Sequence, residues 1–434
     1  MKKLFTENNI KFFLPALILF FFIPNLIMGK IPFPSDTLIG LYHPFRDNSY
    51  LGYSPYRFPV KNPLVADPVL QTYPWRKLSI DQLKAHNLPL WDPYNFSGQP
   101  HIANIQAGTF QLLNILFFIF PFNLAWTMQI IAPLIFAGFF MYLFLKNLNL
   151  LWQSSILGSI AFSFSGFFVS WFTWGTVITT AMWFPLILLS IDKLLSNFKP
   201  KVYFSILVLS TFQLLVSGHL QTALYALIAV IFYIINRFRL LSPKICFQIF
   251  LGFLLGFAIS APQILPTLEL LKYSSRTQDQ AYFIARSDWF IPFKNLIQIV
   301  IPDFLGNPTK NNYWGVFHYG EFVSYIGIIP LFFAFYSFFI KSKNKYFLLL
   351  LFFASIFAIE NPISKSIYTF KIPFISSMQP SRLIFLITFS FSALAAFGVE
   401  GFKSSKISKK IYIPAILLLI ITLLLIILPR LLPG

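Results

Sequence analysis

The sequence has few charged residues. Asp, Glu, Lys and Arg make up 11% of its 434 residues, whereas 57% are hydrophobic. A soluble domain carries about 25% charged residues, so this chain has too little polar material to coat a surface that faces water. Apolar runs recur along it, and a run of about 18 residues can cross a hydrocarbon core of about 30 Å as a helix. The composition predicts an all-α polytopic membrane protein.

The sequence also has little cysteine and none of several common motifs. Its single cysteine, Cys246, excludes an internal disulfide and a multi-cysteine metal site. Neither a Walker A loop nor GxGxxG ahead of a helix, HExxH or GxSxG occurs, so ATP-driven transport and serine hydrolysis lack support. No charged residue falls deep in an expected span, and no matched pair of interrupted helices is seen. Both absences weaken a proton-coupled or inverted-repeat transporter.

The charges that are present are distributed unevenly across the expected topology. With the N-terminus in the cytoplasm, 17 of the 33 Lys and Arg residues fall in short cytoplasmic segments, and 11 of the 14 acids fall outside. This asymmetry is the positive-inside signature of a plasma-membrane protein, so the net charge of +19 does not indicate nucleic-acid binding. The first helix lacks a clear cleavage site and is expected to be a retained anchor. About eleven spans are expected, at 11–29, 122–145, 153–172, 176–194, 202–217, 219–236, 245–268, 321–340, 346–360, 382–402 and 411–429.

This topology makes residues 1–434 one transmembrane domain with two long extracytoplasmic loops, 30–106 and 269–320. Neither loop shows strand alternation, and both are rich in turn residues, so we expect short helices and turns. Long loops are usually functional or disordered, and these are too aromatic to be disordered. The apolar but short segment 107–122 is predicted to be re-entrant or interfacial. The reactive chemistry is therefore expected in the outer loops.

Two carboxylates of the first loop are candidate catalytic groups. Asp36, in FPSDTLIGLYHPFRD, follows the first apolar run closely, so the helix fixes its height above the bilayer. Asp67, in VADPVLQ, has a similar proline-flanked setting. One carboxylate can take a proton from an acceptor hydroxyl while the other orients the acceptor or helps to hold a divalent ion. The alternative is that both are solvated loop charges.

Four polar residues are expected at the outer ends of helices. His219 and Gln221, in SGHLQTALYA, lie where one helix turns into the next, whereas Glu321 and Arg382 begin two later helices. Arginine binds phosphate in a fork geometry, so Arg382 is a candidate partner for a lipid-linked phosphate. The alternatives are a snorkelling anchor for Arg382 and a capping role for His219. With the two loop carboxylates, these residues all project to one side of the membrane.

Aromatic residues crowd the block LPLWDPYNFSGQPHIAN. Trp91 and Tyr94 fit either an interfacial aromatic belt or a platform on which sugar rings pack.

Several motifs together resemble the YfhO-type bacterial membrane proteins. They are LPLWDPYNFSGQPHIAN, FSFSGFFVSWF, SGHLQTALYA, YIGIIPLFFA and QPSRLIFLITFSFSALAAFGVE, and the resemblance runs from about residue 30 to residue 400. It implies the GT-C class of polytopic glycosyltransferases, with a GT-C-like fold, an active site on the outer face and a catalytic Asp in the first loop, by position Asp36. Family members often have Asn where this chain has Asp92, which argues against catalysis by Asp92. The implied partners are a polyprenyl-phosphate-linked sugar and a cell-envelope glycan or lipid acceptor.

We therefore expect a membrane glycosyltransferase that displaces the lipid phosphate directly, with inversion at the anomeric carbon. Asp36 is the expected general base, with Asp67 assisting. Arg382 would stabilise the charge that gathers on the departing phosphate. The sequence requires no cofactor and leaves a divalent cation open. The other expected substrate-binding residues are His219, Gln221, Glu321, Trp91 and Tyr94.

Two other classes of function stay open. A lipid-carrier flippase or other polytopic transporter would explain the helices and an outward cavity, but not the cluster of carboxylates in the outer loop. A non-catalytic scaffold for envelope assembly would be insensitive to every loop carboxylate.

Overall fold

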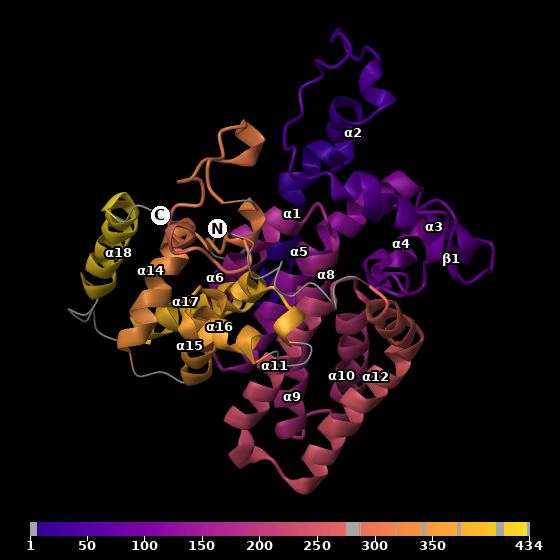
Figure 1. Cartoon of the computed structure of the whole chain (residues 1–434). Coiled ribbons are helices and arrows are strands. Elements are labelled where there is room, and N and C mark those ends of the chain that lie inside the picture. Colours follow the sequence, from indigo (N-terminus) through magenta and orange to yellow (C-terminus); the bar gives the residue numbers. More distant parts are fainter. Residues whose placement is uncertain are drawn as a thin grey trace.

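Helices account for almost all of the regular structure (Figure 1). The computed structural model describes residues 7–274, 286, 288–316, 318–340, 344–370, 375–404 and 412–431. The strands within these residues are β1 (Trp91–Asp92) and β2 (Gln99–Pro100), which pair antiparallel in one hairpin. The helices before the middle of the chain are α1 (Glu7–Ile27), α2 (Ser35–Leu41), α3 (Tyr73–Lys84), α4 (Leu116–Ile119), α5 (Phe122–Asn147), α6 (Trp152–Ser163), α7 (Gly166–Trp171), α8 (Thr176–Ala181), α9 (Phe184–Leu195) and α10 (Pro200–Val216). The later ones are α11 (Leu220–Asn236), α12 (Pro243–Lys272), α14 (Ile328–Tyr336), α15 (Lys345–Ala358), α16 (Pro362–Thr369), α17 (Ile384–Ser404) and α18 (Tyr412–Leu431).

Apolar helices of membrane-spanning length confirm the predicted class, an all-α membrane protein. Six shorter apolar helices lie within the remaining expected spans, so the number of eleven spans stays a prediction. The described residues contain five stretches that are long and apolar enough to cross a membrane: Phe122–Asn147, Trp152–Trp171, Thr176–Leu195, Pro243–Lys272 and Pro380–Lys403.

Aromatic packing joins the central helices α5, α6, α9 and α17 into one core. The ring of Phe389 on α17 lies 4.7 Å from that of Phe184 and 5.7 Å from that of Phe162. Buried rings of this size contribute strongly to packing. At Gly398 an added Cβ would collide with the backbone of Phe333, so α14 and α17 approach more closely than larger residues would allow.

The prediction that Glu321 begins a helix is wrong. Glu321 ends a short 3-10 turn, Tyr319–Glu321, and α14 begins only at Ile328. The intervening residues are largely buried and have no regular secondary structure, and the carbonyl of Tyr325 accepts a hydrogen bond from the backbone of Gly166. Gly327, at φ +95°, then turns the chain into α14. Sequence hydrophobicity does not distinguish this buried irregular segment from the helix that follows it.

The first outer loop is built from short helices, as predicted, together with the hairpin that was not predicted. Helix α3 carries Arg76, which is buried and donates to the Gly108 carbonyl at 3.3 Å and to Asn114 Oδ1 at 2.5 Å. Burial lowers the pKa of Arg76 to about 9. These bonds hold the predicted interfacial segment, which contains the turn Leu112–Ile115 and α4, against α3.

Helix α12 fixes the same loop from the other side. Gln263 donates to the carbonyl of Ile102, and Thr267 Oγ1 donates to the carbonyl of Ala103 at 2.9 Å. The loop is therefore attached to a long membrane helix, although α2 protrudes from the body (Figure 1).

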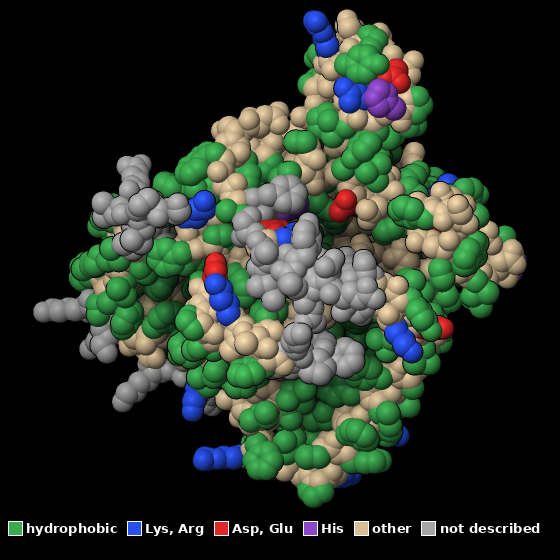
Figure 2. Space-filling view, viewed as in Figure 1, with side chains coloured by type: hydrophobic (Ala, Val, Ile, Leu, Met, Phe, Trp, Pro, Cys, Tyr) green, Lys and Arg blue, Asp and Glu red, His purple; other side chains and the backbone are tan. Residues whose placement is uncertain are grey.

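Basic residues gather at the end of α9 to α12 that lies farthest from α2 (Figures 1 and 2). The turns at this end carry Lys193, Lys199, Lys201, Arg237, Arg239 and Lys244. This clustering agrees with the expected cytoplasmic segments, and the orientation itself stays a prediction. Other basic residues assigned to that side, Lys2, Lys3, Lys341, Lys343, Lys406, Lys409 and Lys410, lie outside the described residues.

A closed polar cluster ties three helices together at the basic end. Asp192 of α9 accepts from Tyr233 of α11 at 2.7 Å and from Asn147 of α5 at 3.1 Å. Arg237 pairs with Asp192 at 3.4 Å and donates to the Tyr233 hydroxyl at 3.0 Å. We call these four residues the inner cluster.

Candidate functional site

An ion pair lies at the opposite end of α11 from the basic turns. Arg382, in the 3-10 turn Pro380–Leu383 before α17, donates through Nε at 3.2 Å and Nη2 at 3.1 Å to the same oxygen of Glu321. Ser381 Oγ donates to the other oxygen of Glu321 at 3.5 Å. The Glu321 carboxylate is buried, whereas the Arg382 side chain is 28% exposed. A partly exposed arginine held in one orientation is suited to receive an anionic group.

Neutral acceptors occupy the third nitrogen of the same guanidinium. Arg382 Nη1 lies 2.8 Å from His219 Nε2 and 3.4 Å from Gln221 Oε1. Because a guanidinium can only donate, His219 Nε2 must be unprotonated. The proton of His219 then lies on Nδ1, which is 2.7 Å from Thr222 Oγ1. Arg382 thus has a single carboxylate partner in these contacts, and its third nitrogen bonds to neutral groups.

The start of α11 and the approach to α17 hold this arrangement in place. His219 is the N-cap residue of α11, and its Nδ1 contacts Thr222, the third residue of that helix turn. Gln221 and Tyr225, one turn apart on α11, both donate to the Gln379 carbonyl, at 2.5 and 3.0 Å. Gln379 in turn donates to the Asp288 carbonyl at 2.9 Å. The sequence motifs SGHLQT and QPSR therefore meet through hydrogen bonds between side chains and backbone.

A wall of three rings leads away from Arg382. The guanidinium carbon lies 5.8 Å from the centre of the Trp171 ring, within range of a cation–π interaction. The Trp171 ring stacks on His318 at 5.8 Å and 15°, and His318 meets Trp174 edge to face at 5.5 Å. Trp171 Nε1 donates to the Gly320 carbonyl at 2.9 Å. These contacts join α7 to the turn that carries Glu321.

The ring wall ends at Asp67. Trp174 Nε1 donates to Asp67 Oδ2 at 3.1 Å, and the Asp67 side chain is exposed. The structure thus connects an exposed carboxylate of the first loop to a partly exposed arginine through Trp174, His318 and Trp171. We call Asp67, the three rings, His219, Gln221, Glu321 and Arg382 the outer cluster.

His318 is the titratable group at the centre of this wall. Its Nδ1 accepts from the backbone of Gly320 at 3.1 Å. Burial lowers the pKa of His318 below its ordinary value of 6.5, with Glu321 acting in the opposite direction and Arg382 in the same one. His318 is therefore neutral at neutral pH.

Asp36 lies in the first turn of α2, close to but not within the outer cluster. Its carboxylate accepts from the backbone of Lys61 at 2.8 Å. Helix α2 packs against the segment Pro68–Thr72, which directly follows Asp67. The two candidate carboxylates therefore belong to neighbouring segments, and Asp67 is the one with a direct contact to the ring wall.

Trp91 and Tyr94 lie on the β1–β2 hairpin, at the edge of the molecule in Figure 1. Their side chains are 54% and 83% exposed, and the Trp91 ring packs over Gly98. Asp92 is buried and accepts from the backbone of Tyr94 at 2.9 Å and from Asn95 at 2.7 Å. Asp92 therefore holds the turn, and the structure does not bring Trp91 or Tyr94 into contact with the outer cluster.

A metal site of the usual protein type is not seen in the described residues. Within them, no group of three or more His, Cys, Asp or Glu side chains could hold a metal ion. A cation held by Asp36 and Asp67 would need further ligands from substrate or water.

Sequence reasoning found five members of the outer cluster and missed the three rings. Trp171, Trp174 and His318 were not singled out, because single aromatics in a membrane protein usually indicate the interfacial belt. The one available signal was the position of His318, three residues before Glu321 in FHYGEF.

Comparison with known proteins gives one match. The family described as "Bacterial membrane protein YfhO" matches residues 106–431, about three quarters of the chain. The match includes His219, Glu321 and Arg382, whereas Asp36 and Asp67 precede it. Neither a curated protein nor a solved structure matches the chain.

Proposed function

The chain belongs to the YfhO family of bacterial membrane proteins, and from this membership we propose that it is a GT-C-type glycosyltransferase. It would move a sugar from a polyprenyl-phosphate donor to a glycan or lipid acceptor of the cell envelope. The reaction would take place on the extracytoplasmic face of the plasma membrane.

The observation that carries this proposal is the outer cluster. It combines a partly exposed arginine, suited to a phosphate, with an exposed carboxylate that can take a proton, and rigid rings separate the two. A transferase that uses a lipid-linked donor needs these two functions at separate positions beside the membrane. A flippase needs no base.

In the proposed reaction, the acceptor hydroxyl oxygen forms a bond to the anomeric carbon of the sugar. The bond from that carbon to the phosphate oxygen breaks, with inversion, and the hydroxyl proton passes to a carboxylate of the first loop. The polyprenyl phosphate leaves with an added negative charge, which Arg382 stabilises. Glu321 and His219 hold Arg382 in position, since each bonds to its guanidinium.

Asp36 and Asp67 are the two proposed proton acceptors. The resemblance to the family favours Asp36, and the contact with Trp174 favours Asp67. An acceptor hydroxyl near the ring wall would meet Asp67 first, while Asp36 on the neighbouring segment would orient the acceptor or help to hold a divalent cation.

The decisive experiment compares Asp36→Asn and Asp67→Asn with the wild-type protein, purified and placed in lipid vesicles. Radiolabelled polyprenyl-phosphate sugars and an envelope glycan fraction serve as donor and acceptor. Loss of the general base should lower transfer by a factor of about 10² to 10⁴. Asp81→Asn is the matched control, because Asp81 is an exposed carboxylate of the same loop that pairs with Lys77.

The other outcomes distinguish the alternatives. No transfer with any donor, together with movement of labelled lipid across the bilayer, would replace the enzyme by a transporter. Normal envelope assembly in cells carrying either variant would favour a scaffold.

A further inference from the structure

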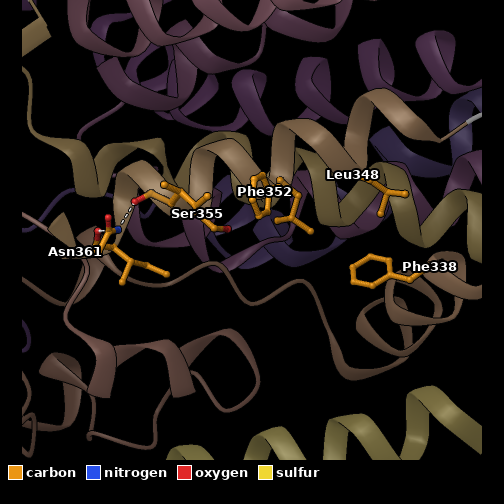
Figure 3. A pocket seen from close by; sticks show the side chains of 8 residues that line it. Phe338, Leu348, Phe352, Ser355 and Asn361 are labelled. Carbon is orange, nitrogen blue, oxygen red and sulfur yellow. Dashed lines mark hydrogen bonds between the residues drawn. The ribbon is translucent and has the colours of Figure 1, made fainter. Parts of the chain in front are cut away.

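Two apolar cavities lie next to each other beside α15. One has a volume of about 480 Å³ and is lined by residues from Phe338 to Asn361 (Figure 3). The other has a volume of about 360 Å³. Ser355 and Ile359 line both cavities. The two cavities are therefore adjacent, with Ser355 and Ile359 between them, and we call them together the groove.

The groove is apolar along its whole length. Ser355 and Asn361 are the polar residues in its lining, and no lining residue is charged. Asn361 directs its amide to the carbonyls of Ile356 and Ile359, at 2.6 and 2.8 Å, because it caps the start of α16. An occupant of this groove must be a hydrocarbon, since a polar group would lose its hydrogen bonds with water there.

One end of the groove is lined by chain neighbours of two residues of the outer cluster. Phe322 and Ile384 line the smaller cavity, and they lie one residue after Glu321 and two residues after Arg382. Further along α17 the lining continues with Ile387 and Phe391. The groove therefore begins at the backbone segments that carry Glu321 and Arg382 and continues along α17.

The other end of the groove opens to the side of the helix bundle. The larger cavity extends along α15 to Leu348, and Phe338 lies across from that helix (Figure 3). Phe352 and Phe338 are 58% and 38% exposed. Helices α14 and α15 both pack on α17, so α17 forms the floor between them. A chain in the groove could thus continue into the bilayer without crossing a polar surface.

We propose that this groove binds the phosphate-proximal part of the isoprenoid chain of the donor, with the phosphate at Arg382. The inference rests on the proposed function and adds to it the place where the lipid lies. The charge arrangement selects this occupant, because the lipid is anionic at one end only, and the cation lies at the end of the groove where that charge would be. Helix α15 has 14 residues and is about 20 Å long, so most of a long polyprenyl chain would remain in the bilayer.

The test uses polyprenyl phosphate that carries a photoreactive diazirine in its first isoprenoid units, in vesicles containing the wild-type protein. After irradiation, the labelled residues are identified by mass spectrometry. We expect labels on α15 and α17 residues that line the groove, and at least tenfold less label after addition of unlabelled polyprenyl phosphate. Phosphatidylglycerol in the same excess should not compete.

Ser355→Trp tests the groove itself, because a large ring at the junction would block both cavities. The matched control is Ser205→Trp, on the exposed face of α10. We expect Ser355→Trp to lower labelling and to raise the KM for a long-chain donor at least tenfold. The KM for a short-chain donor should change little, and Ser205→Trp should leave every value unchanged.

The outcomes separate this inference from the proposed function. If unlabelled polyprenyl phosphate competes with labelling in the groove but no sugar is transferred, the lipid site stands and the proposed transferase activity is wrong. Transfer with labels elsewhere, or unaffected by Ser355→Trp, would overturn the groove and keep the transferase. Equal competition by phosphatidylglycerol would identify the groove as an ordinary contact with membrane lipid and overturn the inference.

Discussion

The outer and inner clusters each contain one pair of an arginine and a carboxylate, and the two pairs are buried to nearly the same degree. Arg382 and Glu321 are 28% and 5% exposed, and Arg237 and Asp192 are 29% and 10% exposed. Burial alone therefore does not separate a site from a structural contact.

The surroundings of the two arginines differ. In the inner cluster, Tyr233 and Asn147 both donate to Asp192, so the contacts of this carboxylate join α9 to α11 and α5. In the outer cluster, the third guanidinium nitrogen is directed to neutral acceptors, and rings connect the arginine to an exposed carboxylate. An arginine pair becomes a candidate site when one nitrogen of the guanidinium bonds only to neutral groups and a second reactive group lies beside the pair.

Arg382→Lys should give the largest effect and the clearest contrast. A lysine cannot bond to Glu321 and His219 in the same fork geometry, so transfer should fall by a factor of about 10² to 10³. Arg237→Lys is the control at the inner cluster, and it should retain most of the transfer per folded molecule. Equal losses of activity in the two variants would contradict the contrast between the clusters.

Asp192→Asn should lower the stability of the protein and leave the rate of transfer by the folded protein unchanged. Removing the acid of a buried pair costs about 3–5 kcal/mol, and because Arg237 is partly exposed we expect about 2 kcal/mol here. The measurement is the thermal midpoint in detergent, together with transfer at a temperature where the variant is folded. A normal midpoint with lost transfer would show that the inner cluster takes part in the reaction.

Trp174→Phe tests the link between the rings and Asp67. It keeps a ring beside His318 and removes the N–H that bonds to the carboxylate. A hydrogen bond to a charged group contributes about 1.5–3 kcal/mol, so we expect kcat to fall roughly tenfold with little change in donor KM. Trp314→Phe, at an exposed tryptophan of the second loop, is the control.

The smallest expected effect is the contribution of His318 to the pH dependence of stability. The pKa of His318 is lower in the folded protein than its ordinary value of 6.5. At a pH between the folded pKa and 6.5, the unfolded chain therefore binds more protons than the folded protein. The free energy of unfolding should therefore fall as pH decreases through 6.5 and level off below the folded pKa. His318→Gln should flatten this slope in thermal midpoints measured from pH 5 to 8, whereas His86→Gln, at an exposed histidine, should not.

Much of the fold could be predicted from the sequence, because each membrane helix is a local apolar run. The expected spans 202–217 and 219–236 correspond closely to α10 and α11. The start of α14 was misplaced because the buried irregular segment before Gly327 is as apolar as a membrane helix. The hairpin at Trp91 was missed because strands of two residues have no periodicity to detect.

The candidate site could be predicted in part for a similar reason. His219, Glu321 and Arg382 were placed on one side because each lies at an end of an expected apolar span. The contact of Asp67 with Trp174 joins residues 107 positions apart, and no local pattern specifies it. Trp91 and Tyr94 were proposed for substrate binding from residue type alone, and the hairpin places them apart from the outer cluster.

The length of helix α12 suggests that the activity of the protein depends on bilayer thickness. Its 30 residues extend about 45 Å, beyond a hydrocarbon core of about 30 Å, and only 22% of its most apolar stretch is buried by protein. We expect the helix to adjust its tilt to the surrounding lipid, and the bonds of Gln263 and Thr267 would pass that tilt to the first loop. In vesicles made from lipids of increasing acyl-chain length, the rate of transfer should pass through an optimum. The double variant Gln263→Leu, Thr267→Val should have a broader optimum than the wild type.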